Sequence, residues 1–104
     1  MKCNILISTF STLEEAKEIS HTVVQEKLAA CANILGEVSS VYTWNGEITE
    51  EKEIALLLKT SKKLVMKLTE RVKALHSYDC PCITALSIVG GNADYITWIK
   101  HETL

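Results

Sequence analysis

Two strand-like runs meet at Asn45-Gly46, and both are long for a chain of 104 residues. Asn-Gly is a strong signal for a tight hairpin, because both central residues of a type I′ turn have positive φ. The extended pattern covers about residues 33–44 before the turn and about residues 47–60 after it. Each arm would span on the order of 40 Å, whereas a domain of about 100 residues has a radius of gyration near 13 Å. The hairpin should therefore project beyond its core, and because exposed strand edges pair readily with other chains, it predicts an oligomer.

The composition predicts a single globular domain covering residues 1–104. A chain of this length supports one hydrophobic core, and an apolar fraction of 47% excludes extensive disorder. The formal net charge is −2 and Arg71 is the single arginine, whereas surfaces that bind nucleic acid are basic. We therefore expect no nucleic-acid partner.

The N-terminal residues and the cysteines bear on location. Residues 1–7 are only briefly apolar and lack a cleavage-site pattern, which favours a strand over a signal peptide. No run approaches the roughly 20 apolar residues of a transmembrane helix. In a chain without a secretion signal, the four cysteines are expected to be reduced: Cys3, Cys31, Cys80 and Cys82. We predict a cytoplasmic protein with no membrane partner.

The apolar periodicity predicts the elements before the turn. Residues 2–9 alternate like a strand, and Ser11 or Thr12 then offers the N-cap of a helix. That helix should end near residue 27 or 28. Gly36 indicates a bulge or a bend in the first arm of the hairpin. The returning arm is apolar on both faces in its second half, which predicts a central strand.

The remaining pattern completes the fold prediction. Thr60 or Ser61 should cap a second helix with one apolar stripe: Leu64, Leu68, Val72 and Leu75. Residues 76–81 read as a loop and residues 83–89 as a strand. A last amphipathic helix carries apolar and aromatic residues: Tyr95, Ile96, Trp98 and Ile99. The order βαββαβ plus a terminal helix predicts an α+β ferredoxin-like sandwich with two helices on one face of an antiparallel sheet.

The densest group of functional side chains lies in the loop from residue 76 to residue 82. It contains an imidazole, a phenol, a carboxylate and two thiols: His76, Tyr78, Asp79, Cys80 and Cys82. Such a set could bind a metal or position a polar ligand. The alternative is a plain helix-to-strand connection in which Pro81 shapes the turn. Cys80 and Cys82 could jointly hold a soft ion, with further ligands from elsewhere.

Other polar residues support weaker hypotheses. A nucleophilic Cys31 with His76 as its base is disfavoured, because its neighbours are alanines that supply no activation; we predict that the protein is not an enzyme. The carboxylates near the turn, at residues 50, 51 and 53, read as a solvated arm. Lys59 ends an apolar strand and could face a cleft. The first loop lacks both the Cys-x-x-Cys of a metallochaperone and the arginine of an acylphosphatase-like enzyme.

In combination, five segments spread in order along the chain resemble the CutA divalent-cation tolerance family. They are Leu28-Ala-Ala-Cys-Ala-Asn33, Ser40-Val-Tyr-Thr-Trp-Asn-Gly-Glu-Ile48, Lys59-Thr60, His76-Ser-Tyr-Asp-Cys-Pro81 and Gly91-Asn-Ala-Asp-Tyr-Ile-Thr-Trp98. The resemblance implies a ferredoxin-like homotrimer that is architecturally similar to PII signalling proteins, with clefts between subunits. It also implies a link to copper tolerance and divalent-metal binding.

The chain departs from the family pattern around the loop. The usual His-Pro-Tyr-Glu is His76-Ser-Tyr-Asp79 here, and the usual Pro-Glu is Pro81-Cys82. Enterobacterial relatives carry a cysteine and a second histidine where this chain has Ser8 and Leu75. The copper-binding set of those relatives therefore transfers only at His76.

The residues and the resemblance together predict a trimeric protein that binds copper, another divalent cation or a small ligand and acts in metal tolerance. The predicted metal ligands are His76, Cys80 and Cys82. The predicted contacts in a ligand cleft are Tyr78, Asp79 and Lys59. The predicted packing residues of the hairpin and subunit junction are Tyr42, Trp44 and Trp98. The alternative function is a PII-like signalling module that binds an anionic or nucleotide-like ligand between subunits.

Overall fold

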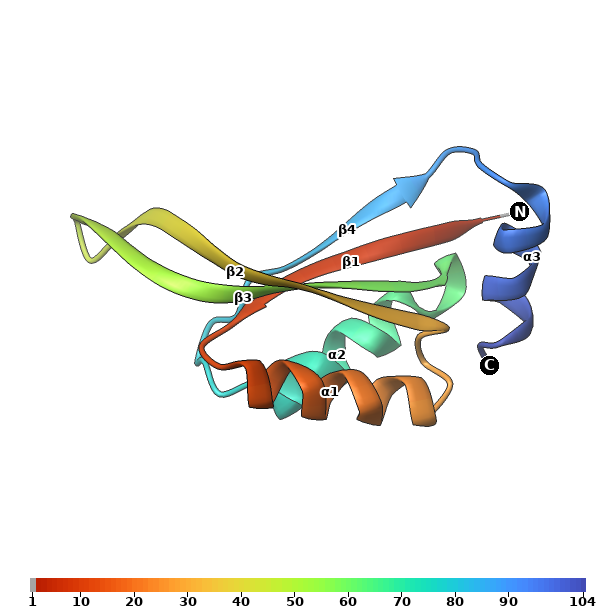
Figure 1. The fold of residues 1–104 in the computed structure, drawn as a ribbon, viewed down its shortest axis with the longest axis horizontal. Helices are drawn as coiled ribbons and strands as arrows, with labels where there is room; N and C mark the ends of the chain where they lie inside the picture. Colours follow the sequence, from red (N-terminus) through yellow and green to blue (C-terminus); the bar gives the residue numbers. More distant parts are fainter. Residues whose placement is uncertain (1) are drawn as a thin grey trace.

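The chain folds into a four-stranded antiparallel sheet with three helices, in a computed structural model that describes residues 2–104. The elements in order are β1 Cys3–Phe10, α1 Leu13–Gln25, β2 Cys31–Trp44, β3 Glu47–Ser61, a short 3₁₀ helix Lys62–Leu64, α2 Val65–Leu75, β4 Ile83–Ile88 and α3 Ala93–His101. The strand order is β2-β3-β1-β4. Figure 1 shows α1 and α2 side by side under one face of the sheet and α3 at one end. The predicted α+β arrangement of βαββαβ plus a C-terminal helix is confirmed.

Local sequence signals explain where the first helix begins. The Thr12 hydroxyl accepts a hydrogen bond from the Glu15 backbone N–H at 3.1 Å, which makes Thr12 the N-cap of α1. The helix ends at Gln25, slightly earlier than predicted, and Lys27 then adopts a φ of 61°. The predicted caps of the second helix were wrong in part. The Thr60 hydroxyl donates to the Leu28 carbonyl oxygen instead. Ser61 is the N-cap of the short 3₁₀ helix that precedes α2 and makes no side-chain cap bond there, and the N-cap of α2 itself is Leu64.

The main core lies between the sheet and the first two helices. The side chains of β1 and β3 that point toward α1 and α2 are fully buried and include Leu6, Phe10, Leu56 and Leu58. Leu64, Leu68 and Val72 of the predicted stripe complete this core, whereas Leu75 is partly exposed at the helix end. Even-numbered residues of β1 and β3 therefore face the helices, and odd-numbered residues face the opposite side.

The hairpin extends well beyond the sheet. Asn45 and Gly46 both have positive φ, and a register shift between Ile34 and Gly36 confirms the predicted bulge. β1 stops pairing with β3 at Ile54, so the residues from 38 to 53 form a two-stranded ribbon around the turn. The molecule measures 44 × 25 × 22 Å, and the ribbon projects from one end of it (Figure 1). The predicted projection is confirmed.

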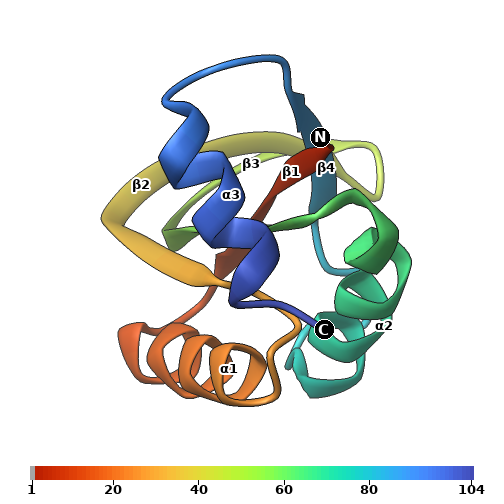
Figure 2. The same ribbon diagram turned by 90° about the vertical axis from the view of Figure 1, so that its right-hand side faces the viewer.

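The second face of the sheet is covered at one end only. Cys3, Ala30 and Ile99 form a small buried cluster there, and α3 crosses that end of the sheet in Figure 2. The other end of this face, at the base of the ribbon, is hollowed into a pocket. Within residues 2–104, no helix has the length and apolar character needed to span a membrane.

Candidate functional site

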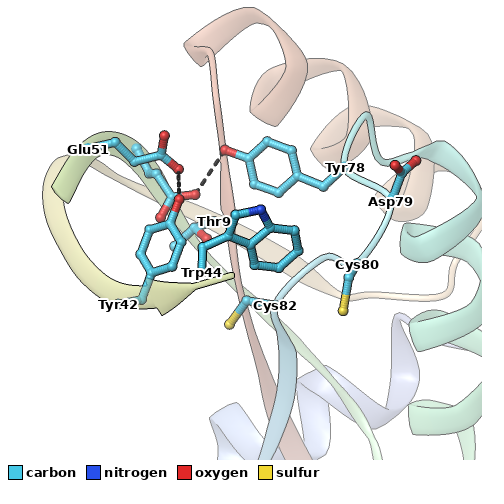
Figure 3. Close-up of a pocket in the computed structure, with 9 residues that line it drawn as sticks. Thr9, Tyr42, Trp44, Glu51, Tyr78, Asp79, Cys80 and Cys82 are labelled. Atoms are coloured by element: carbon cyan, nitrogen blue, oxygen red, sulfur yellow. Dashed lines mark hydrogen bonds between the residues drawn. The ribbon is translucent and has the colours of Figure 1, made fainter. Parts of the chain in front are cut away.

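A pocket of about 330 Å³ lies where the ribbon leaves the sheet (Figure 3). The β2–β3 ribbon supplies one wall, and the loop between α2 and β4 supplies the other. The lining residues are Thr9, Tyr42, Trp44, Glu51, Glu53, Tyr78, Asp79, Cys80 and Cys82. Predicted cleft residues, predicted soft donors and predicted packing aromatics therefore meet in one place.

Two tyrosine–carboxylate pairs organise the pocket. The Tyr78 hydroxyl donates to Glu53 at 2.9 Å, and the Tyr42 hydroxyl donates to Glu51 at 2.5 Å (Figure 3). Glu53 is only 7% exposed, because it follows directly on the last position where β1 covers β3 and Tyr78 closes over it. The interpretation of this carboxylate as part of a solvated arm was wrong. Each pair ties a ring of the site to an acidic side chain.

The carboxylates keep both phenols protonated. Burial, followed by the hydrogen bond to Glu53, raises the pKa of Tyr78 well above its usual range. The hydrogen bond to Glu51 raises the pKa of Tyr42 from an ordinary 10.0 to about 12. At neutral pH both hydroxyl groups are therefore donors, and the carboxylates present their remaining lone pairs to the pocket.

These shifts predict a pH dependence at the alkaline end. A folded-state pKa above the unfolded value gives stability that is present below about pH 10 and is lost as the pH rises through the folded-state pKa. The tyrosinate absorbance of the folded protein should therefore lag behind that of the urea-unfolded chain above about pH 10. Replacing both Tyr42 and Tyr78 by phenylalanine should shorten the lag. Coincident titration of folded and unfolded protein would contradict the two hydrogen-bonded pairs.

His76 lies beneath the pocket and is fully engaged by its surroundings. Its side chain is 0% exposed, and its ring stacks on Phe10 with centroids 4.4 Å apart. Nε2 lies 2.9 Å from the Thr9 carbonyl oxygen, and Nδ1 accepts the Tyr78 backbone N–H at 3.1 Å. The tautomer with its proton on Nε2 satisfies both contacts. In this arrangement neither ring nitrogen is free to bind a metal.

The loop that follows His76 is fastened to the first helix. Glu15 accepts hydrogen bonds from the Ser77 backbone N–H at 2.8 Å and from the Ser77 hydroxyl at 3.0 Å. The same carboxylate lies 3.8 Å from Nδ1 of His76. These contacts set the path of the chain into Tyr78 and Asp79. Ser77 therefore gives the loop a hydrogen-bonded connection to α1.

The predicted metal ligands are brought together only in part. Cys80 and Cys82 are free, exposed thiols that line the pocket, whereas His76 is absent from its lining. Across residues 2–104, no group of three or more histidine, cysteine or acidic side chains is arranged as a metal site. A single chain thus presents two soft donors with Asp79 nearby in the same pocket, and the role of His76 as a ligand stays a prediction that requires its two contacts to break.

Lys59 and Trp98 lie at the opposite end of the same sheet face. The Lys59 ammonium is 3.3 Å from the Tyr95 hydroxyl and 5.3 Å from the centre of that ring. Tyr95 in turn stacks on Trp98, with centroids 5.5 Å apart. Lys59 stands six residues beyond Glu53 along β3, which is about 20 Å. The structure therefore does not bring the predicted cleft lysine to the pocket within one chain.

Three lining residues had no place among the predicted site residues: Thr9, Glu51 and Glu53. The strand period could have indicated the two carboxylates. Glu51 pairs with Ser40 across the ribbon and Glu53 pairs with Val38, so both share the face that carries Tyr42. Thr9 gave no signal of its own, because it reaches the pocket only through its place near the end of β1.

The comparisons with known proteins agree with this fold. The sequence model described as "CutA1 divalent ion tolerance protein" matches residues 4–102. The divalent-cation tolerance protein CutA of Thermus thermophilus is 43% identical over 99 residues, which are 95% of this chain and 96% of that protein. The chloroplastic protein CutA of Arabidopsis thaliana is 41% identical over 95% of this chain but only 54% of its own length.

A solved structure gives the same result. The crystal structure of CutA1 from Oryza sativa superposes with a TM-score of 0.96 at 39% identity, covering 100% of this chain and 95% of that one. Sequence identities of 39% and 43% over nearly the whole chain show a relationship in sequence as well as in fold. The chain therefore belongs to the CutA1 divalent ion tolerance protein family.

Proposed function

We propose that this protein acts in divalent-cation tolerance as a non-enzymatic regulatory protein that binds a metal cation in the pocket at the base of the ribbon. The charge of the lining carries this proposal. Glu51, Glu53 and Asp79 contribute three carboxylates, and among the described residues no lysine, arginine or histidine lines the pocket. Such a lining attracts cations and repels anions.

The donor types favour copper or zinc over harder cations. Cys80 and Cys82 offer thiolates, which select soft or borderline metals, and Asp79 offers an oxygen donor in the lining of the same pocket. His76 would add the imidazole of the predicted ligand set if the loop opened. The PII-like alternative needs an anionic ligand, and the acidic lining of the pocket disfavours it.

We further propose that the functional unit is a cytoplasmic homotrimer with PII-like architecture. Within the described residues 2–104, the outer edges of β2 and β4 have no neighbouring strand in the sheet of a single chain. The ribbon carries exposed apolar residues, among them Val41 and Ile48. Leu86 and Val89 are exposed at the other edge of the sheet, in β4 and directly after it. Unpaired edges with apolar side chains are surfaces that other copies of a chain cover.

Metal titration tests the proposed function. The reduced protein should bind copper or zinc saturably in calorimetry, and changing both Cys80 and Cys82 to serine should weaken binding at least about tenfold, because even outer-shell partners of a metal site cost ~10–100-fold. Cys31→Ser is the matched control, since this thiol is half-buried and lies outside the pocket. Absence of saturable binding, or equal losses in both variants, would contradict the metal role.

A further inference from the structure

We propose that the same pocket also takes an organic ammonium cation, held by an aromatic cage with acidic walls. Three rings line it, those of Tyr42, Trp44 and Tyr78, together with the three carboxylates. A cation over the face of an aromatic ring is attracted by the ring quadrupole, most strongly for tryptophan. This ammonium site rests on the proposed function in that it uses the same pocket. It depends, however, on the aromatic rings, which supply no ligand to a metal ion.

Hydrogen bonds hold two of the three rings in place, and the third is accessible. The hydrogen bonds to Glu51 and Glu53 fix the outer ends of the Tyr42 and Tyr78 rings, and Figure 3 shows the Trp44 indole in the same group. Trp44 remains 58% exposed, so a ring face is open to a ligand. Two tyrosine rings held in this way spare a ligand the cost of ordering them.

Glu53 supplies the charge that such a ligand would neutralise. This carboxylate is 7% exposed, accepts a hydrogen bond from Tyr78, and has no basic partner within 4.0 Å among residues 2–104. A buried carboxylate without a counter-ion is costly. A cation seated between the rings would compensate that charge while its alkyl groups cover apolar ring surface.

The size of the pocket fits a small ligand. Its volume of about 330 Å³ lies at the lower end of the range of roughly 300–1,000 Å³ for ligand pockets. A hydrated metal ion keeps its water shell between its charge and the indole face, whereas an alkylated ammonium spreads its charge over methyl groups that contact the ring directly. The thiols of Cys80 and Cys82 contribute to the rim and are dispensable for this ligand.

Choline and 3,3-dimethylbutan-1-ol, its uncharged isostere, are suitable probes because they share a shape and differ in charge. With the full-length protein in its native assembly, saturation-transfer NMR on the methyl resonance should give saturable binding for choline and at least about threefold weaker binding for the alcohol. In a Trp98→Phe background, Trp44 is the single tryptophan, and choline should change its fluorescence.

Matched variants make the test specific. Glu53→Gln and Trp44→Leu should each weaken choline binding at least about threefold. Glu70→Gln, which removes the same charge from an exposed site on α2, and Trp98→Phe should leave binding unchanged. Equal binding of the alcohol, equal losses in Glu70→Gln, or a pocket filled by a lysine side chain of a second copy would overturn the inference.

The outcome separates this inference from the metal role. The variant in which Cys80 and Cys82 are both serine should bind choline as the wild type does while losing metal. Metal binding without choline binding would overturn the cage alone. Choline binding without metal binding would overturn the proposed metal function alone, and loss of both would overturn both.

Discussion

Replacing His76 by alanine is expected to lower the free energy of unfolding by about 2–4 kcal/mol. The change removes a buried ring that stacks on Phe10 and leaves the Thr9 carbonyl oxygen and the Tyr78 backbone N–H without their partner. A buried polar group left unpaired costs about 1–3 kcal/mol. Urea unfolding should be measured at several protein concentrations, because association of the chains also adds to apparent stability.

His76→Gln is the informative companion to this change. Glutamine keeps one donor and one acceptor at the end of a side chain, so it should recover part of the loss, whereas alanine recovers none. Metal titration of His76→Gln then separates the two roles of the histidine. A supporting role predicts lower stability with metal affinity changed little, while a ligand role predicts that affinity falls as well. A loss of stability below about 0.5 kcal/mol in His76→Ala would contradict the buried, doubly bonded ring.

The features that could be predicted from the sequence are those fixed by neighbouring residues. Asn45-Gly46 determined the turn because few other pairs tolerate two positive φ angles. Thr12 marked the start of α1 through a bond to a residue three positions ahead. Gly36 marked the bulge for a similar reason, since its φ of 91° is strained for other residues. The apolar periodicity then supplied the order of the elements along the whole chain.

The candidate site depended on contacts that no local pattern encodes. His76 and Cys80 are close in sequence, yet the backbone between them turns so that one enters the core and the other faces solvent. Lys59 and Glu53 share one face of one strand, but the length of β3 separates them. Glu53 was read as solvated because its burial requires Tyr78, twenty-five residues away in sequence. Loop residues and ribbon residues meet only when the tertiary fold is complete.

Shortening the hairpin is expected to abolish assembly. The variant removes residues 39–52 and joins Val38 to Glu53 through Asn-Gly, which is feasible because these two residues already face each other across the ribbon. The core should survive, since no removed residue belongs to it. The mass in solution should fall from three times the 11.6 kDa of one chain to about that of one chain, because the ribbon carries exposed apolar residues and a long part of the free edge of β2. Light scattering after size exclusion measures this change.

Point variants show whether the ribbon acts through its apolar side chains. Val41 and Ile48 lie on one face of the ribbon and are 64% and 81% exposed. Changing both residues to serine should weaken assembly. Met66→Ser is the control, because this residue is 76% exposed on α2, away from the ribbon. A wild-type chain that is monomeric, or a shortened chain that still forms trimers, would contradict the role of the ribbon in assembly. Dissociation by Val41→Ser with Ile48→Ser, but not by Met66→Ser, would locate the subunit contact on that face, which leaves the opposite face, with Tyr42 and Trp44, to the pocket.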